Sequence, residues 1–352
     1  MEEPTEPDPS AETEVMPDDA KAMAAAAGSN PTNPLGTWEP PSAKELDALL
    51  EGYDVETLIG RVGMGAVYKG VQKNLDRIVA IKILPEELAG DPDFEERFER
   101  EAKALAQLNH QNIVQIYDFG QSAGRHWFFA MEFVDGVDFH DLIKTGQLES
   151  EGALNAVSQM CDALAYAHGE GLIHRDIKPA NIFLNKQGIL KIGDFGLAKI
   201  IDPAAADSRI ASLTMTGAAM GTPHYSAPEQ MDGREVDHRA DIYSLGVMFY
   251  EMLTGKIPQG AFDPPSKKVE VDVRVDEVVL RAMAEEPERR YQTVVEVRTD
   301  VDAIREKPAS ENHTTERAPC LPALKSSPST ASLRPVLWVM GSCLPGKLQT
   351  CF

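Results

Sequence analysis

The stretch that decides the fold is "HRDIKPAN", residues 174–181, which places an aspartate, a lysine and an asparagine within six residues. Asp176 is an anion and a proton acceptor, Lys178 is a cation, and Asn181 carries an amide. An aspartate close to an asparagine is, by itself, usually a loop cap. The meaning of this stretch therefore depends on the blocks that surround it in the chain.

Four other short blocks accompany it, in a fixed order: "IGRVGMGAVYKG" (59–70), "VAIK" (79–82), "DFG" (194–196) and "APE" (227–229). A single three-letter match arises often by chance, but five blocks in order with this spacing form a specific signal. Over about residues 53–303 the set resembles the protein-kinase family, more closely the bacterial eukaryotic-like (Hanks-type) serine/threonine kinases. The resemblance implies an α+β bilobal fold, with a small antiparallel β-sheet lobe that holds one main helix and a larger α-helical lobe.

Hydrophobic periodicity agrees with two lobes. The runs "YDVETLIG", "AVYKGVQ" and "RIVAIKIL" alternate or are β-branched and predict strands, and "DPDFEERFEREAKALAQLNH" has the apolar spacing of a helix. Later segments such as "DHRADIYSLGVMFYEMLTG" show helical spacing. We predict a kinase N-lobe over residues 53–134 and a C-lobe over residues 135–303.

The two ends of the chain have a different composition. The first 19 residues hold eight acids and no base, and residues 1–52 are predicted to be an acidic, Pro/Ala-rich disordered tail. Residues 304–352 are predicted to be a low-complexity, disordered tail. Its end, "LQTCF", is compatible with a truncated or frame-shifted terminus and with a small docking segment, and the sequence leaves both readings open.

Composition excludes several functions. The chain has 352 residues and a net charge of −22, which disfavours nucleic acid as a partner. Its four cysteines show no zinc or disulfide spacing, which favours a reducing compartment. No stretch approaches the roughly 20 apolar residues of a membrane span, and the N-terminus is acidic where a secretory signal would be basic. We expect a cytoplasmic protein without a membrane span in this chain.

The resemblance implies which groups act on the substrate. Phosphoryl transfer needs positioning and charge neutralisation more than covalent chemistry. Asp176 would orient the hydroxyl of a substrate serine or threonine, and Lys178 would neutralise charge at the transferred phosphate. Thr222, in "GTPHYSAPE", would contact both. The "KPAN" form resembles serine/threonine rather than tyrosine kinases, so the expected partners are proteins with Ser or Thr acceptors.

The resemblance also implies how phosphates and metal are held. Lys82 would reach the α- and β-phosphates of ATP and would pair with Glu101 on the following helix. Asn181 and Asp194 would bind Mg²⁺, with Mn²⁺ as an alternative, because hard oxygen ligands suit these ions. A simpler interpretation is that Lys82 and Glu101 are unrelated surface charges. However, an unpaired ammonium in the apolar run around Lys82 would be costly.

The expected nucleotide site combines a glycine-rich loop, an apolar adenine slot with Met131 at its rear, a hinge from Glu132 to Val134, and Asp138 beside the ribose. An apolar stripe is more often ordinary core, and here it can serve as both. The implied cofactor-binding residues are Ile59, Gly60, Arg61, Val62, Gly63, Met64, Gly65, Val67, Ala80, Lys82, Met131, Glu132, Val134, Asp138 and Phe183.

Val62 occupies the middle glycine position of the loop. If its φ must be positive, the strain is about 1–3 kcal/mol, equivalent to a roughly tenfold to hundredfold loss of nucleotide affinity. Gly60, Gly63 and Gly65 remain, and so do the lysine and the metal ligands. We therefore predict an active enzyme with a weakened grip on ATP, in which Val62→Gly lowers the Michaelis constant for ATP.

Other residues are expected to support or regulate the site. Ser212, Thr214 and Thr216 are autophosphorylation candidates in an activation loop, with Arg175 placed to hold the phosphate, although flexible loops are rich in Ser and Thr without being modified. The resemblance also implies a column of four stacked residues that couples the lobes: His174, Phe195, Leu105 and Ile116. Asp241 would anchor the catalytic loop, and Glu229 would form a buried pair with Arg290.

Two further expectations follow from the resemblance. The alternative to an active kinase is a pseudokinase scaffold or nucleotide-binding module, with Val62 as the first sign of decay. Relatives commonly form homodimers through the small lobe, so a homodimer through the N-lobe is expected as well.

Overall fold

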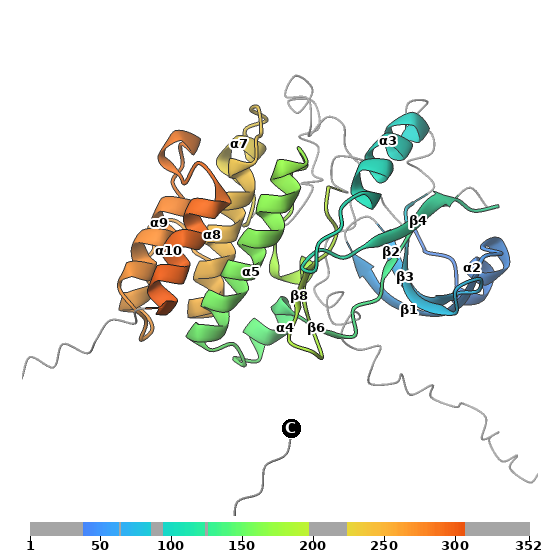
Figure 1. The fold of residues 1–352 in the computed structure, drawn as a ribbon, viewed down its shortest axis with the longest axis horizontal. Coiled ribbons are helices and arrows are strands. Elements are labelled where there is room, and N and C mark those ends of the chain that lie inside the picture. The colour runs from blue at the N-terminus through green and yellow to red at the C-terminus, as the bar shows by residue number, and fades with distance from the viewer. Residues whose placement is uncertain (1–37, 63–64, 86–93, 124–125, 197–223, 307–352) are drawn as a thin grey trace, which may run out of the picture. The chain divides into compact units, whose positions relative to one another are not determined.

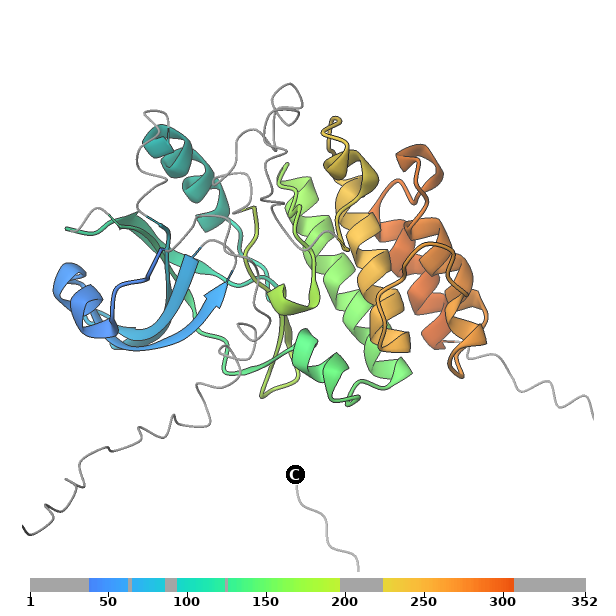
Figure 2. The same cartoon turned by 180° about the vertical axis from the view of Figure 1, so that it is seen from behind.

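The computed structural model describes residues 38–62, 65–85, 94–123, 126–196 and 224–306. A lobe built on an antiparallel sheet is followed along the chain by a mainly helical lobe (Figure 1). Figure 2 shows the same arrangement from behind. The predicted bilobal α+β fold is confirmed. Within the described ranges, no helix is long and apolar enough to cross a membrane.

The first lobe contains a five-stranded antiparallel sheet in the order β1-β2-β3-β5-β4. Its strands are β1 (Tyr53–Val62), β2 (Gly65–Gln72), β3 (Arg77–Ile83), β4 (Ile116–Gln121) and β5 (Trp127–Glu132). The register places Lys82 of β3 between Val67 of β2 and Phe129 of β5. Because cross-strand partners share a face, the Lys82 ammonium stands on the face that is otherwise apolar.

Helix α3 (Phe94–Ala106) covers that inner face. The ring of Phe98 lies 4.9 Å from the ring of Phe129 and 4.6 Å from that of Trp127, between ring centres. The helix predicted in this segment is confirmed, and so is its apolar stripe, because the four residues at helical spacing are all buried. They are Phe94, Phe98, Ala102 and Leu105.

Helix α2 (Ala43–Leu49) covers the outer face of the sheet. Residues 1–52 were expected to be a disordered tail, and for residues 38–50 that expectation is wrong. Ser42 and Glu45 form a capping box that starts the helix. Leu46 and Leu50, one turn apart, are buried against the sheet. The acidic composition of the whole segment hid this short amphipathic pattern.

The second lobe contains a three-stranded antiparallel sheet, β6-β7-β8, and a stack of helices. The strands are β6 (Gly136–Asp138), β7 (Ile182–Asn185) and β8 (Leu190–Ile192). The helices are α4 (Phe139–Lys144), α5 (Ser150–Gly169), α7 (Pro228–Met231), α8 (Arg239–Thr254), α9 (Arg274–Ala282) and α10 (Val294–Glu306), with 3₁₀ turns η3 (Pro179–Asn181), η4 (Pro265–Lys267) and η5 (Pro287–Arg289).

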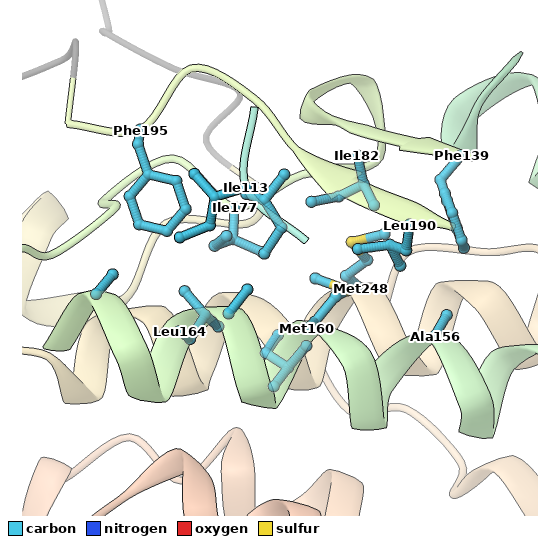
Figure 3. Close-up of a cluster of buried hydrophobic side chains, with 14 of the residues drawn as sticks. Ile113, Phe139, Ala156, Met160, Leu164, Ile177, Ile182, Leu190, Phe195 and Met248 are labelled. Atoms are coloured by element: carbon cyan, nitrogen blue, oxygen red, sulfur yellow. The ribbon is translucent and has the colours of Figure 1, made fainter. Parts of the chain in front are cut away.

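The core of this lobe lies directly beneath the site. Leu164 of α5, Ile177 and Phe195 gather in one buried cluster (Figure 3). Ile177, the residue after Asp176, is fully buried. Packing therefore fixes the backbone of the loop that carries Asp176, the predicted catalytic residue, against a rigid helix.

Strand β8 also connects the second lobe to the first. Val114 N donates to the Ile192 carbonyl at 2.9 Å, and Ile192 N donates to the Asn112 carbonyl at 2.8 Å. Beside them, Lys191 Nζ lies 2.8 Å from the carboxylate of Glu132, at the end of β5. The segment after α3 and the end of β5 are thus both tied to one short strand.

Candidate active site

Asp176, Lys178 and Asn181 meet around one carboxylate. Lys178 Nζ lies 2.8 Å from Asp176 Oδ2, and Asn181 Nδ2 donates to the same oxygen at 3.1 Å and to the Asp176 carbonyl at 2.8 Å. The Asp176 side chain remains 28% exposed, so a substrate hydroxyl can reach it. The Asn181 amide nitrogen is used within the loop, which leaves its oxygen for another ligand.

Asp241 of α8 holds the catalytic loop from beneath, as predicted. Its buried carboxylate accepts hydrogen bonds from the backbone N–H of His174 at 2.9 Å and of Arg175 at 2.8 Å, and lies 2.8 Å from His168 Nε2. Arg175 has a φ of 69°, which a non-glycine residue adopts only when its surroundings fix it. Burial alone would raise the pKa of Asp241, but its bonds to His168 and His174 hold that pKa below the ordinary value.

Lys82 meets Asp194. Its Nζ lies 2.7 Å from Asp194 Oδ2, and the two side chains are 5% and 20% exposed. Asp194 has a φ of 55°, and this left-handed conformation places its carboxylate toward β3. Burial raises the pKa of the Asp194 carboxyl, but Lys82 and Lys178 outweigh it, so the pKa is lower than usual and the group is ionised at neutral pH.

The expected pairing of Lys82 with Glu101 is not the one that the structure holds. Glu101 lies on α3, is buried, and accepts from Arg100 Nη2 at 3.0 Å. It is also within electrostatic range of Arg175. The buried ammonium of Lys82 instead takes the carboxylate of Asp194, whose backbone turn brings it within hydrogen-bonding distance.

The segment that carries Asp194 is tied to the catalytic loop. Gly193 N donates to the Asn181 carbonyl at 2.8 Å, and the Gly193 carbonyl lies 2.9 Å from His174 Nε2. The backbones on which Asn181 and Asp194 sit are therefore adjacent. Two hard oxygen donors next to a lysine that can hold phosphate fit a divalent cation bound jointly with a triphosphate.

The predicted column is also brought together. The rings of His174 and Phe195 lie 4.5 Å apart between centres. Phe195 lines one small apolar cavity together with Leu105, Ile116 and Met131. Met131, predicted at the rear of the adenine slot, therefore borders the same cavity as the column.

The residues predicted to line an adenine slot are apolar and mostly buried. Ile59, Val67 and Ala80 are buried on the inner face of the sheet, and Ala80 lies directly across from Met131 in the strand register. Phe183, the predicted wall from the second lobe, lies in β7, where a Cβ on Gly193 would lie 2.9 Å from its ring. Glycine at position 193 thus permits the close approach of this wall.

The hinge offers backbone rather than side chains. Glu132 is engaged by Lys191, and its backbone N–H donates to the Gln115 carbonyl at 2.8 Å. Val134 is 4% exposed. Since the Glu132 carboxylate is already paired, its predicted part in nucleotide binding reduces to the main chain.

Asp138 divides its carboxylate between two environments. Oδ1 accepts from the Asp141 N–H at 2.8 Å and caps α4, while Oδ2 is buried with no hydrogen-bond partner in the described part of the chain. Burial raises the pKa of Asp138 above its ordinary value. A buried acceptor without a donor fits the predicted contact with a ribose hydroxyl.

The glycine-rich loop is described on both sides of its tip. Val62 ends β1 and pairs with Gly65, so its backbone is extended and the premise of a positive φ is wrong. A Cβ on Gly65 would lie 2.5 Å from the Ile83 carbonyl oxygen, so this glycine is needed for close strand packing. Gly60 and Arg61 lie in β1. The remaining predicted loop residues, Gly63 and Met64, lie outside the described residues.

The other residues that lie outside the described ranges are Thr222 and the three phosphorylation candidates Ser212, Thr214 and Thr216. Sequence reasoning missed two residues near the site, His168 and Lys191. Each follows an apolar residue in an ordinary helix or strand, so neither carried a local signal.

Comparison with known proteins agrees with this geometry. Residues 53–315 match the family model described as the protein kinase domain. The chain belongs to the protein kinase family, and the predicted likeness to bacterial serine/threonine kinases of eukaryotic type is confirmed.

Bacterial kinases are among the relatives that the chain resembles. The chain is 42% identical to the serine/threonine-protein kinase PknB of Mycobacterium leprae over 272 residues, which cover 72% of this chain and 43% of PknB. It is 35% identical to the serine/threonine-protein kinase pkn3 of Myxococcus xanthus, covering 84% of this chain and 57% of pkn3. The crystal structure of the Mycobacterium tuberculosis PknI kinase domain matches with a TM-score of 0.59 and 30% identity, over 72% of this chain and 96% of that one. The chain thus spans only part of the curated relatives it matches.

Proposed function

We propose that this chain is an active serine/threonine protein kinase that transfers the γ-phosphate of ATP to Ser or Thr hydroxyls of protein substrates. The observation that carries the proposal is the cluster of Lys178 and Asn181 on the partly exposed carboxylate of Asp176. The three groups that decayed kinases usually lose are all present: Lys82, Asp176 and Asp194. Among the site residues that the structure describes, none favours the pseudokinase alternative.

Asp176 is proposed to orient the acceptor hydroxyl and to take its proton. The hydroxyl oxygen then forms a bond to the γ-phosphorus, the bond from that phosphorus to the β–γ bridging oxygen breaks, and ADP leaves with the electron pair. Lys178, already 2.8 Å from Asp176, would balance the charge on the transferred group. Thr222 is proposed to contact both residues.

The triphosphate is proposed to be held from two sides. Lys82 would bind its α- and β-phosphates, while Asn181 and Asp194 would hold Mg²⁺ or Mn²⁺, which would supply positive charge to the phosphate oxygens. Glu101 is proposed to become the partner of Lys82 when phosphates are bound. The low pKa of Asp194 supports this assignment, because only the ionised carboxylate is a good metal ligand.

A label-transfer assay tests the function. The full chain is incubated with γ-labelled ATP, a generic basic protein, and Mg²⁺ or Mn²⁺. Asp176→Asn should lower incorporation by about 100-fold or more, because general-base and positioning effects are of this size, and it should leave nucleotide binding intact. Asp263→Asn, at an exposed carboxylate, is the matched control. Equal incorporation by the wild type and Asp176→Asn contradicts the proposal.

Autophosphorylation on Ser212, Thr214 or Thr216 is part of the same proposal, with Arg175 as the cation that holds the phosphate. Phosphosites are mapped by mass spectrometry in protein expressed as the wild type and as Asp176→Asn. Phosphate on this loop should appear only in the wild type, and the same phosphate in both samples excludes autophosphorylation.

Several wider expectations remain proposals. Residues 53–134 and 135–303 are proposed as the functional lobes, and the cytoplasm as the site of action, because ATP is available there. A homodimer through the N-lobe is also proposed. Because α2 covers the outer face of the sheet, the strands of that face are not themselves available for the dimer contact. Sedimentation of the full chain measures its oligomeric state.

A further inference from the structure

Residues 38–50 form a structured segment that has no part in the proposed catalytic steps. The protein kinase match begins at residue 53, so the segment precedes the matched region. It lies on the outer face of the sheet, opposite α3 (Figure 1). The strands beneath it include β1 and β2, which the glycine-rich loop joins into a hairpin.

Apolar contacts attach the segment to the sheet. Leu46 is fully buried and Leu50 is 4% exposed, in a cluster that contains Tyr68 of β2 and Ile81 of β3. Trp38 packs at the margin of this cluster. Burying two leucine side chains contributes about 3–6 kcal/mol in apolar transfer, which is enough to hold a short helix in place.

Two hydrogen bonds tie the segment to the hairpin strands themselves. The Tyr68 hydroxyl donates to the Pro41 carbonyl at 2.5 Å. The backbone N–H of Val55, in β1, donates to Asp47 Oδ1 at 2.8 Å. One contact therefore lies on each of the two strands.

The outer contacts act on the inner face through strand geometry. Successive side chains of a strand point to opposite faces, so Tyr68 faces the segment while its neighbour Val67 faces the adenine slot. Gly65 and Ala66 precede them on the same strand, and Ala66 belongs to the outer cluster. Contacts that fix the outer side of β2 therefore also fix the position of Val67 on the side that faces the proposed nucleotide site.

We propose that residues 38–50 are a positioning segment that keeps the β1–β2 hairpin ordered for nucleotide binding. The inference rests on the proposed kinase function. A hairpin that is already ordered loses little conformational entropy when ATP binds, whereas a loosened hairpin must be ordered at the expense of affinity. The segment should thus set the Michaelis constant for ATP and leave the chemical step at Asp176 unaffected.

The test compares two variants of the full chain that add the same charge to the same helix. Leu46→Asp disrupts the buried contact, and Ala48→Asp, at an exposed position, is the control. Leu46→Asp should raise the KM for ATP about fivefold or more with kcat within about twofold, a split that marks lost ground-state positioning. Ala48→Asp should keep both constants. Amide exchange over residues 53–72 should accelerate only in Leu46→Asp.

An unchanged KM in a folded Leu46→Asp chain overturns the proposal, whether or not residues 53–72 exchange faster, and so does a fall in kcat alone. If Leu46→Asp does not fold, Tyr68→Phe removes only the hydroxyl bonded to Pro41, and a KM equal to that of the wild type overturns the proposal. Failure of the kinase function itself is distinct, because the wild type would then transfer no label.

Discussion

The guanidinium of Arg290 lies against the carboxylate of Glu229, with N–O distances of 2.6 and 2.7 Å, and both side chains are buried. Arg290 also donates to the carbonyls of Ala284, Arg239 and Glu285. All five of its N–H groups are thus used. The pair predicted from "APE" and "PERRY" is confirmed, and it joins α7 to the loop before α10.

Glu229→Ala should lower the free energy of unfolding by about 3–5 kcal/mol, because it leaves a buried guanidinium without its anion. Thermal or urea unfolding measures the loss. Glu235→Ala, at an exposed glutamate, is the control and should match the wild type. A Glu229→Ala melt that coincides with the wild type shows that the pair contributes nothing to stability.

Asp138→Ser tests the ribose contact without removing the helix cap. Serine keeps one oxygen for the Asp141 N–H but lacks the second, unpartnered oxygen. Wild-type protein should bind ATP more tightly than 2′,3′-dideoxy-ATP, by about fivefold to tenfold for one hydrogen bond. Asp138→Ser should bind the two nucleotides equally. If the preference for ATP survives in Asp138→Ser, another group contacts the ribose.

Val62→Gly should change the KM for ATP by less than about threefold, because an extended valine stores no strain for glycine to relieve. This small change replaces the larger decrease in the KM for ATP that the sequence alone predicted. Glycine should instead weaken β1, by about 0.5–1 kcal/mol, which unfolding experiments can measure. A tenfold decrease in KM would show that position 62 adopts a positive φ when nucleotide binds.

Asp241 should make stability depend on acid pH. Its pKa is below the ordinary 3.8, so its ionised form stabilises the fold above that pH, and the contribution is lost as the pH falls toward the folded-state pKa. Between about pH 4 and pH 2, Asp241→Asn should therefore lose less unfolding free energy than the wild type. Urea unfolding across this range measures both slopes, with exposed Asp232→Asn as control. Parallel slopes for Asp241→Asn and the wild type contradict the assignment.

The parts of the site that short sequence spacing determines were predictable. Asp176, Lys178 and Asn181 lie within one loop, so their meeting needs only a tight turn and its 3₁₀ continuation. The apolar stripe of α3 was equally legible, because helical periodicity fixes which residues share a face.

Other features depend on long-range geometry that the sequence does not encode locally. Glu101 was the predicted partner of Lys82, and the pairing with Asp194 instead depends on a left-handed φ at Asp194. Helix α2 was missed because the acidic, proline-containing residues before it dominate the composition of the segment. Its signal was the capping box of Ser42 and Glu45, followed by Leu46 and Leu50.

Strand β8 has a mechanical consequence. Lys191 forms an ion pair with Glu132 at the end of β5. Ile192 forms backbone hydrogen bonds with Asn112 and Val114, in the segment after α3. Because both connections lie on one three-residue strand, a rotation of the sheet lobe about β8 can leave them intact, whereas a translation along β8 would break them. We therefore expect the entry of a nucleotide and the release of its product to involve rotation of the lobes near β8.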